Sequence, residues 1–332
     1  MGPPNLKPKE LDLPCKTTRA AHSRFWKPLI TIAFTLGTFY LIFRANAFED
    51  LFGSFKQVGA TDLPIFFLLF IGMRLLQAGS LAWIMKIQRV RLRFHDALEL
   101  SALKGFYNLG FSGAGLVAQA IRARSSNFFT VRQLAWATLL LSLLLISTQG
   151  IMLAVTSLIF FHQKTMMIFG TSVGVIFGLL PLLILYLVKH GLVPRLVVPI
   201  KIYNLLEEFG ILIAQSTITN ISVAWLLQAS LVILRVGRIV LIAYLLDADG
   251  PAGIFAAITL SADLATVVPL TPGGIGLREF VIGIGAGFVG HLELFIAAAV
   301  IDRAITLVGN LTHGLWVIST SFQMGGKSRD PR

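Results

Sequence analysis

Charged residues and cysteine are both scarce in this sequence. Only 13% of the 332 residues are charged and the mean hydropathy is +0.79, whereas a soluble domain carries about 25% charged residues. Cys15 is the only cysteine, which excludes an internal disulfide and a thiolate metal cluster. The chain also lacks the HExxH, CxxC, GxSxG and Walker A patterns, and its six histidines are scattered without metal-ligand spacing. These absences predict a protein without a metal or a cofactor, and they give no motif for an enzyme.

Long apolar runs account for most of the remaining sequence. The hydrocarbon core of a bilayer is about 30 Å thick and needs about 20 apolar residues in a helix. The apolar runs of this chain do not alternate with polar residues, so transmembrane β-strands are excluded. The sequence therefore predicts an all-α integral membrane protein with about six full spans. These spans are residues 28–43, 63–85, 134–161, 166–188, 220–246 and 294–320.

The basic residues outside the spans gather in alternate loops and in the two tails. These basic stretches are residues 1–27, 86–93, 122–132, 189–201 and 321–332, and no signal-peptide pattern precedes the first span. The net charge of +12 would suggest a nucleic-acid partner in a soluble protein, but alternate basic loops instead orient a membrane protein. We expect a multi-pass protein of the cell (inner) membrane and no nucleic-acid partner. Its transmembrane domain would be 28–320, and both tails, 1–27 and 321–332, would be cytoplasmic.

Two apolar segments are interrupted by glycine and proline. Residues 95–121 lie between two basic loops and are rich in glycine, and residues 252–290 lie between two acidic loops and contain Pro269 and Pro272. Because each segment begins and ends on one side, each is predicted to be a re-entrant hairpin of two half-helices. Irregular backbone at membrane depth is tolerated only against protein or a water-filled cavity. The alternative is an additional pair of full spans with kinks.

The two interrupted segments resemble each other at a constant offset. Gly113 pairs with Gly274 and Arg74 with Arg235 at a separation of 161 residues. With the charge-based orientation, this pattern predicts an inverted repeat with units at about 63–161 and 220–320. In transporters, such repeats place a substrate site near the bilayer midplane, where broken helices from both halves meet. The alternative is a chance similarity between two glycine-rich kinks.

Ionisable residues lie within the predicted spans, where each costs about 2.5–3.5 kcal/mol. Either they form structural ion pairs, or the arginines bind a lipid phosphate, which a guanidinium matches with two hydrogen bonds. The spans contain five arginines but only three nearby acids, one of them Asp263. This excess of positive charge favours the binding of an anion. Arg74 and Arg235 have no acid spaced to neutralise them on their own helices, so we expect a lipid phosphate as their counter-ion. The candidate substrate-binding residues are Arg74, Arg235, Arg238, Pro272, Gly273, Gly274, Gly276, Arg278, Glu279, Asp302, Arg303 and Asn310.

The run PLTPGGIGLRE at residues 269–279 resembles the P-x-T-P-G-G-[IL]-G-[VL]-R-E signature of the lysylphosphatidylglycerol synthase transmembrane region family, also called flippase-like domain proteins. Residues 108–122 look like the second family element, N-x-x-x-P-G-R-x-G-E-x-x-R. They lack its proline, and they have Ala114 near the usual arginine and Leu116 in place of the acid. The resemblance implies translocation or binding of a membrane phospholipid or a polyprenyl-type lipid. In the family the aminoacyl-transfer domain follows the membrane region, and because the chain ends at Arg332 we expect no synthase reaction.

Three classes of function are consistent with these features. A flippase-like lipid transporter accounts for the repeat, the arginines and the family signature together. An enzyme or enzyme subunit that modifies a lipid head group would need an acid/base pair, for which Asp302 and Glu279 are the candidates. A membrane scaffold without transport is the third class. A lipid-modifying enzyme is a possible partner, and the sequence leaves the oligomeric state open.

Overall fold

Five long apolar helices form the body of the protein in the computed structural model, which describes residues 59, 61–109, 114–124, 129–192, 200–214, 216–246, 252–267, 277–289 and 292–325. These helices are α3 (Leu63–Ile87), α6 (Val131–Phe160), α7 (Lys164–Lys189), α9 (Ile218–Leu245) and α12 (Leu292–Gly325). Each is long and apolar enough to cross a membrane. They confirm five of the six predicted spans, and the remaining one, 28–43, lies outside the described residues. No strand occurs in the described part of the chain.

The outer surface of these helices is apolar, as lipid requires. On α7, for example, Phe169, Ile176 and Leu183 are all exposed, whereas a soluble protein rarely exposes apolar patches of such extent. Two of the described spans, α6 and α9, begin with a threonine whose side chain caps the helix. Thr130 and Gln133 form a capping box at the start of α6, in which each side chain satisfies a backbone N–H that the helix leaves free.

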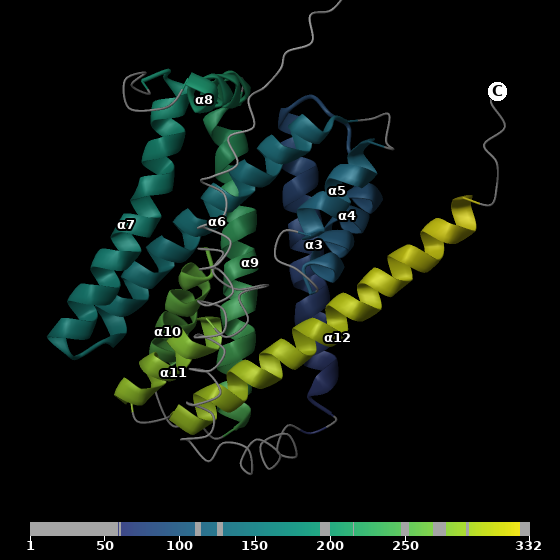
Figure 1. Cartoon of the computed structure of the whole chain (residues 1–332). Coiled ribbons are helices and arrows are strands. Elements are labelled where there is room, and N and C mark those ends of the chain that lie inside the picture. The colour runs from purple at the N-terminus through teal and green to yellow at the C-terminus, as the bar shows by residue number, and fades with distance from the viewer. Residues whose placement is uncertain are drawn as a thin grey trace, which may run out of the picture.

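Four shorter helices form two hairpins at opposite ends of the molecule (Figure 1). One hairpin consists of α4 (Phe94–Tyr107) and α5 (Ala114–Arg124), and the other of α10 (Ala252–Ala265) and α11 (Leu277–Val289). The helices of each pair pack side by side. With 11 to 14 residues, each helix is about 17–21 Å long, which is too short to cross a bilayer alone. The lengths therefore favour re-entrant hairpins over an additional pair of full spans.

The long and short helices follow the same order in both halves of the chain. A long helix, two short helices and a long helix occur as α3–α4–α5–α6 and again as α9–α10–α11–α12. The two leading helices, α3 and α9, pack together and run in opposite directions in Figure 1. A hairpin helix of each half also packs against the last long helix of the other half: α4 against α12, and α10 against α6. This is the packing expected of an inverted repeat, which stays a prediction.

The tightest helix pair is α6 with α7. A Cβ atom added to Gly150 on α6 would overlap the backbone of Gly178 on α7, so the two backbones approach more closely than side chains would permit. One further helix, α8 (Ile200–Ala214), lies at the same end of the bundle as the α4–α5 hairpin (Figure 1). The sequence did not predict α8. It is joined to the start of α6 by an ion pair between Glu208 and Arg132.

Candidate functional site

The charged residues within the bundle lie near its mid-height. Arg74 is close to the middle of α3, about 17 Å from the first residue of the helix and about 20 Å from the last. Arg235 and Arg238 follow the midpoint of α9 by one and two turns. Asp302 and Arg303 precede the midpoint of the membrane-crossing part of α12 by about one turn. Charges at this depth are costly unless they face other protein groups or a cavity.

A buried ion-pair network joins the four helices of the second half. Arg278 on α11 donates from Nε to Asp263 Oδ1 of α10 (2.8 Å) and from Nη1 to Asp302 Oδ2 of α12 (2.9 Å). Arg238 on α9 donates from Nε to Asp302 Oδ1 (2.7 Å). Arg235, one turn before Arg238, places its Nε 3.1 Å from Asp263 Oδ2. Arg238, Arg278 and both carboxylates are almost completely buried, so this network ties α9, α10, α11 and α12 to one another.

One of these contacts revises a sequence-based prediction. A lipid phosphate was expected as the counter-ion of Arg235, but Asp263 of the neighbouring α10 already forms an ion pair with it. This partner lies on another helix, where spacing along α9 could not indicate it. Asp302 and Thr306 both accept hydrogen bonds from Arg238.

Arg74 has a different environment from the other four arginines. Its Nη1 donates to Gln77 Oε1 of the same helix (2.8 Å), and its Nη2 donates to Asn310 Oδ1 of α12. In the described part of the chain, no carboxylate lies within ion-pair distance of Arg74, whereas Arg303 is paired with Glu279 (2.8 Å). The three acids of the cluster are thus held by four arginines, and the fifth arginine has only neutral partners.

A cavity of about 180 Å³, here called the arginine cavity, brings all five arginines together. It is lined by Arg74, Arg235, Arg238, Arg278 and Arg303, with Asp302 as the one carboxylate residue among the described lining residues. Four pairs of its lining residues are 161 positions apart in the sequence. These pairs are Phe70 with Leu231, Arg74 with Arg235, Gln77 with Arg238, and Leu145 with Thr306. Both halves of the chain therefore contribute corresponding residues to one cavity.

A second cavity of about 240 Å³, here called the amide cavity, lies between α3 and the α4–α5 hairpin and extends to α6 and α9. It shares Arg74 and Gln77 with the arginine cavity. The lining residues with amide side chains are Gln77, Asn108, Gln119 and Gln228, and those with hydroxyls are Ser101, Thr138 and Ser142. Lys104 adds a second positive charge, and none of the lining residues that the structure describes is acidic.

Gly105 brings α4 close to Arg74 at the junction of the two cavities. A Cβ at this position would lie 2.6 Å from Arg74 Nη2 and 2.7 Å from Asn310 Oδ1. The absence of a side chain therefore leaves room for the guanidinium and for its amide partner. A larger residue would displace these side-chain ends from their positions.

The structure brings most of the predicted site residues together. Arg74, Arg235, Arg238, Arg278, Asp302 and Arg303 line the arginine cavity, Glu279 is paired with Arg303, and Asn310 is bonded to Arg74. The predicted Pro272, Gly273, Gly274 and Gly276 lie outside the described residues. Sequence reasoning missed Lys104, Gln77 and Gln119. A lysine in an apolar segment was a usable signal, but isolated glutamines were not.

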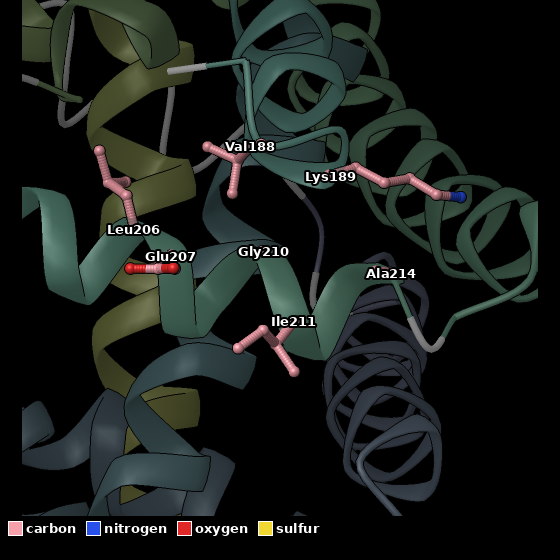
Figure 2. A pocket seen from close by; sticks show the side chains of 8 residues that line it. Val188, Lys189, Leu206, Glu207, Gly210, Ile211 and Ala214 are labelled. Atoms are coloured by element: carbon pink, nitrogen blue, oxygen red, sulfur yellow. The ribbon is translucent and has the colours of Figure 1, made fainter. Parts of the chain in front are cut away.

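A third hollow, of about 270 Å³, lies between the end of α7 and α8 (Figure 2). Its lining is mostly apolar, and its two charged residues, Lys189 and Glu207, extend away from each other. The hollow lies at the end of the bundle rather than at mid-height. It therefore lacks both the convergent polar groups and the depth of the other two cavities.

Comparison with known protein families identifies a match over most of the chain. A family model described as the lysylphosphatidylglycerol synthase TM region matches residues 28–314. No curated protein matches the chain. The matched region includes every described residue that lines the arginine and amide cavities.

Proposed function

Because the chain belongs to the lysylphosphatidylglycerol synthase TM region family, we propose that it translocates a phosphate-bearing lipid across the cell membrane. The observation that carries this proposal is the arginine cavity at mid-height, to which Arg74 of the first half and Arg235 of the second half both contribute. A site shared by two inverted halves can be opened to either side in turn.

The charge of the cavity supports an anionic substrate. The described cluster holds five arginines against the carboxylates of Asp263, Glu279 and Asp302. A guanidinium that is removed from water without a counter-ion is costly. A lipid phosphate at Arg74 would supply that counter-ion and would form charge-assisted hydrogen bonds.

Transport rather than head-group chemistry is proposed because the candidate acids are already engaged. Asp302 accepts hydrogen bonds from Arg238 and Arg278, and Glu279 accepts one from Arg303. A general acid or base must reach the proton that it transfers, and carboxylates held between arginines are poorly placed for this. The ion pairs instead hold the second half of the bundle together.

Reconstitution into vesicles tests the proposal. Fluorescent phosphatidylglycerol is incorporated with the purified full-length protein, and dithionite then quenches the label in the outer leaflet, with and without a membrane potential and a pH gradient. We expect the fraction of fluorescence that dithionite cannot quench, the protected fraction, to fall below its value in protein-free vesicles under at least one condition. A protected fraction equal to that of protein-free vesicles under every condition would refute lipid translocation.

We also propose that both termini face the cytoplasm, with the basic end of the bundle on that side. In a Cys15→Ser background, Arg91→Cys at the basic end and Lys164→Cys at the start of α7 place thiols at exposed positions at opposite ends. A membrane-impermeant maleimide added outside intact cells should label only the second variant. Labelling of only the first variant would reverse the orientation.

A further inference from the structure

The two adjoining cavities differ in the hydrogen-bonding groups that they leave unused. In the arginine cavity the unused groups are donors. Arg238 Nη1 and Arg278 Nη2 are buried and have no acceptor among the described residues. A buried donor without an acceptor costs free energy. Phosphate oxygens are acceptors only, so a phosphate fits this cavity.

In the amide cavity the buried side-chain atom that lacks a described hydrogen-bond partner is an acceptor. Gln119 is 3% exposed, and its Nε2 donates to the backbone oxygen of Leu100 (2.9 Å). This bond fixes the amide orientation, because the opposite orientation would place two acceptors against each other. Gln119 Oε1 is buried and accepts no hydrogen bond from any described residue. A phosphate has no proton to offer this oxygen, whereas a hydroxyl or an ammonium does.

The positive charge of the amide cavity decides between a hydroxyl and an ammonium as the donor to Gln119. Arg74 and Lys104 both line the amide cavity, and the described lining residues include no carboxylate. An ammonium group in this cavity would be placed beside two positive charges, and like charges repel strongly in a partly desolvated site. A hydroxyl satisfies Gln119 without that repulsion. The remaining amides and the hydroxyls of Ser101 and Ser142 can also exchange hydrogen bonds with a polyol.

We propose that this protein selects lipids whose phosphate carries a neutral polyol, such as glycerol or a sugar, and excludes head groups that carry an amine. The phosphate occupies the arginine cavity and the polyol occupies the amide cavity, with Arg74 and Gln77 at their junction. The inference rests on the proposed lipid translocation and adds to it the chemical class of the head group. It assigns Gln119 and Lys104 to specificity.

The test compares three lipids with identical acyl chains: phosphatidylglycerol, phosphatidylethanolamine and lysylphosphatidylglycerol. Binding to the purified full-length protein in neutral detergent is measured by titration, and transfer is measured in vesicles. We expect phosphatidylglycerol to bind at least about tenfold more tightly than either aminated lipid. Gln119→Glu, which adds a carboxylate with nearly the same shape, should reduce this ratio about tenfold or reverse it.

Two further variants make the comparison decisive. Gln163→Glu adds the same charge at an exposed position before α7, at the opposite end from the α4–α5 hairpin, and should leave the ratio unchanged. Lys104→Gln removes one of the two repelling cations and should also lower the ratio, which keeps the test valid if Gln119→Glu does not fold.

The outcomes separate the inference from the proposed function. If the wild-type protein moves all three lipids equally, or moves the aminated lipids faster, translocation stands and head-group selection is refuted. A ratio that persists in both Gln119→Glu and Lys104→Gln also refutes the assignment of the amide cavity. If the wild-type protein neither binds nor moves any of the three lipids, the proposed function itself fails.

Discussion

Replacing Arg74 by glutamine tests whether this arginine binds the lipid or only stabilises the fold. Among the described residues, Arg74 forms hydrogen bonds with the neutral side chains of Gln77 and Asn310. The variant therefore leaves no described buried carboxylate without a partner. We expect the protein to fold and to retain its thermal stability in detergent within about 1–2 kcal/mol. The hydrogen bonds lost from the guanidinium, about 1.5–3 kcal/mol each, are offset because a charge that costs about 2.5–3.5 kcal/mol at this depth is also removed.

Lipid binding is expected to weaken in the same variant. A hydrogen bond to a charged group contributes about 1.5–3 kcal/mol, and each 1.4 kcal/mol changes a dissociation constant tenfold. Arg74→Gln should thus weaken the binding of fluorescent phosphatidylglycerol by about ten- to a hundredfold. Arg74→Lys should restore only part of this loss, because an ammonium lacks the planar, bidentate geometry of a guanidinium.

The assay combines lipid titration with thermal unfolding of the same detergent-solubilised sample. Arg132→Gln is the matched control, because it removes an arginine of equal charge from an exposed ion pair with Glu208 outside both cavities. It should change neither measurement by more than about 1 kcal/mol. Normal lipid binding by Arg74→Gln would refute the phosphate site, and unfolding without loss of affinity would show that Arg74 is structural.

Three other substitutions test separate parts of the structure. Gly105→Ala should displace the guanidinium of Arg74 and weaken lipid binding several-fold with little effect on thermal stability; unchanged affinity would contradict the close approach at the cavity junction. Asp302→Ala leaves two buried arginines with one fewer carboxylate and should lower the free energy of unfolding by about 3–5 kcal/mol, measured by denaturant titration in detergent; a loss below about 1 kcal/mol would mean that the network contributes little. Gly150→Leu should lower the unfolding temperature by forcing α6 from α7, whereas Gly237→Leu, which has open space at this position, should not; equal effects would indicate that helix propensity, not packing, is responsible.

The spans were predictable because length and apolarity decide them locally. The predicted 63–85 and 220–246 correspond to α3 and α9 within two residues at each end, since a membrane-crossing helix must end where the charged loops begin. The helix α8 was not predicted. Its segment contains Glu207 and Glu208, which gave no span signal and no clear soluble-helix pattern.

Only part of the site could be predicted, since the spacing of residues along one helix does not show which residues of other helices they pair with. Arg74 and Arg235 stand out because arginine is costly in a span. The partner of Arg235, Asp263, lies 28 residues further along the chain on another helix, so only the three-dimensional packing identifies it. Gln77 and Gln119 carry no charge and occur in apolar helices without a motif, although they contribute much of the amide cavity.

The two halves differ in the polar contacts that join their hairpins to the long helices. The α10–α11 hairpin is bound to α9 and α12 through Asp263 and Arg278, which are buried ion-pair partners, and separating a buried charge from its partner costs about 3–5 kcal/mol. The α4–α5 hairpin meets α3 through a neutral bond, from Ser101 Oγ to Gln77 Oε1 (3.2 Å), and a neutral hydrogen bond contributes about 1 kcal/mol. Of these described polar contacts, the ion pairs of the α10–α11 hairpin are therefore the stronger. The amide cavity lies against α4 and α5, so the proposed head-group site is enclosed by the hairpin whose polar contact with α3 is neutral.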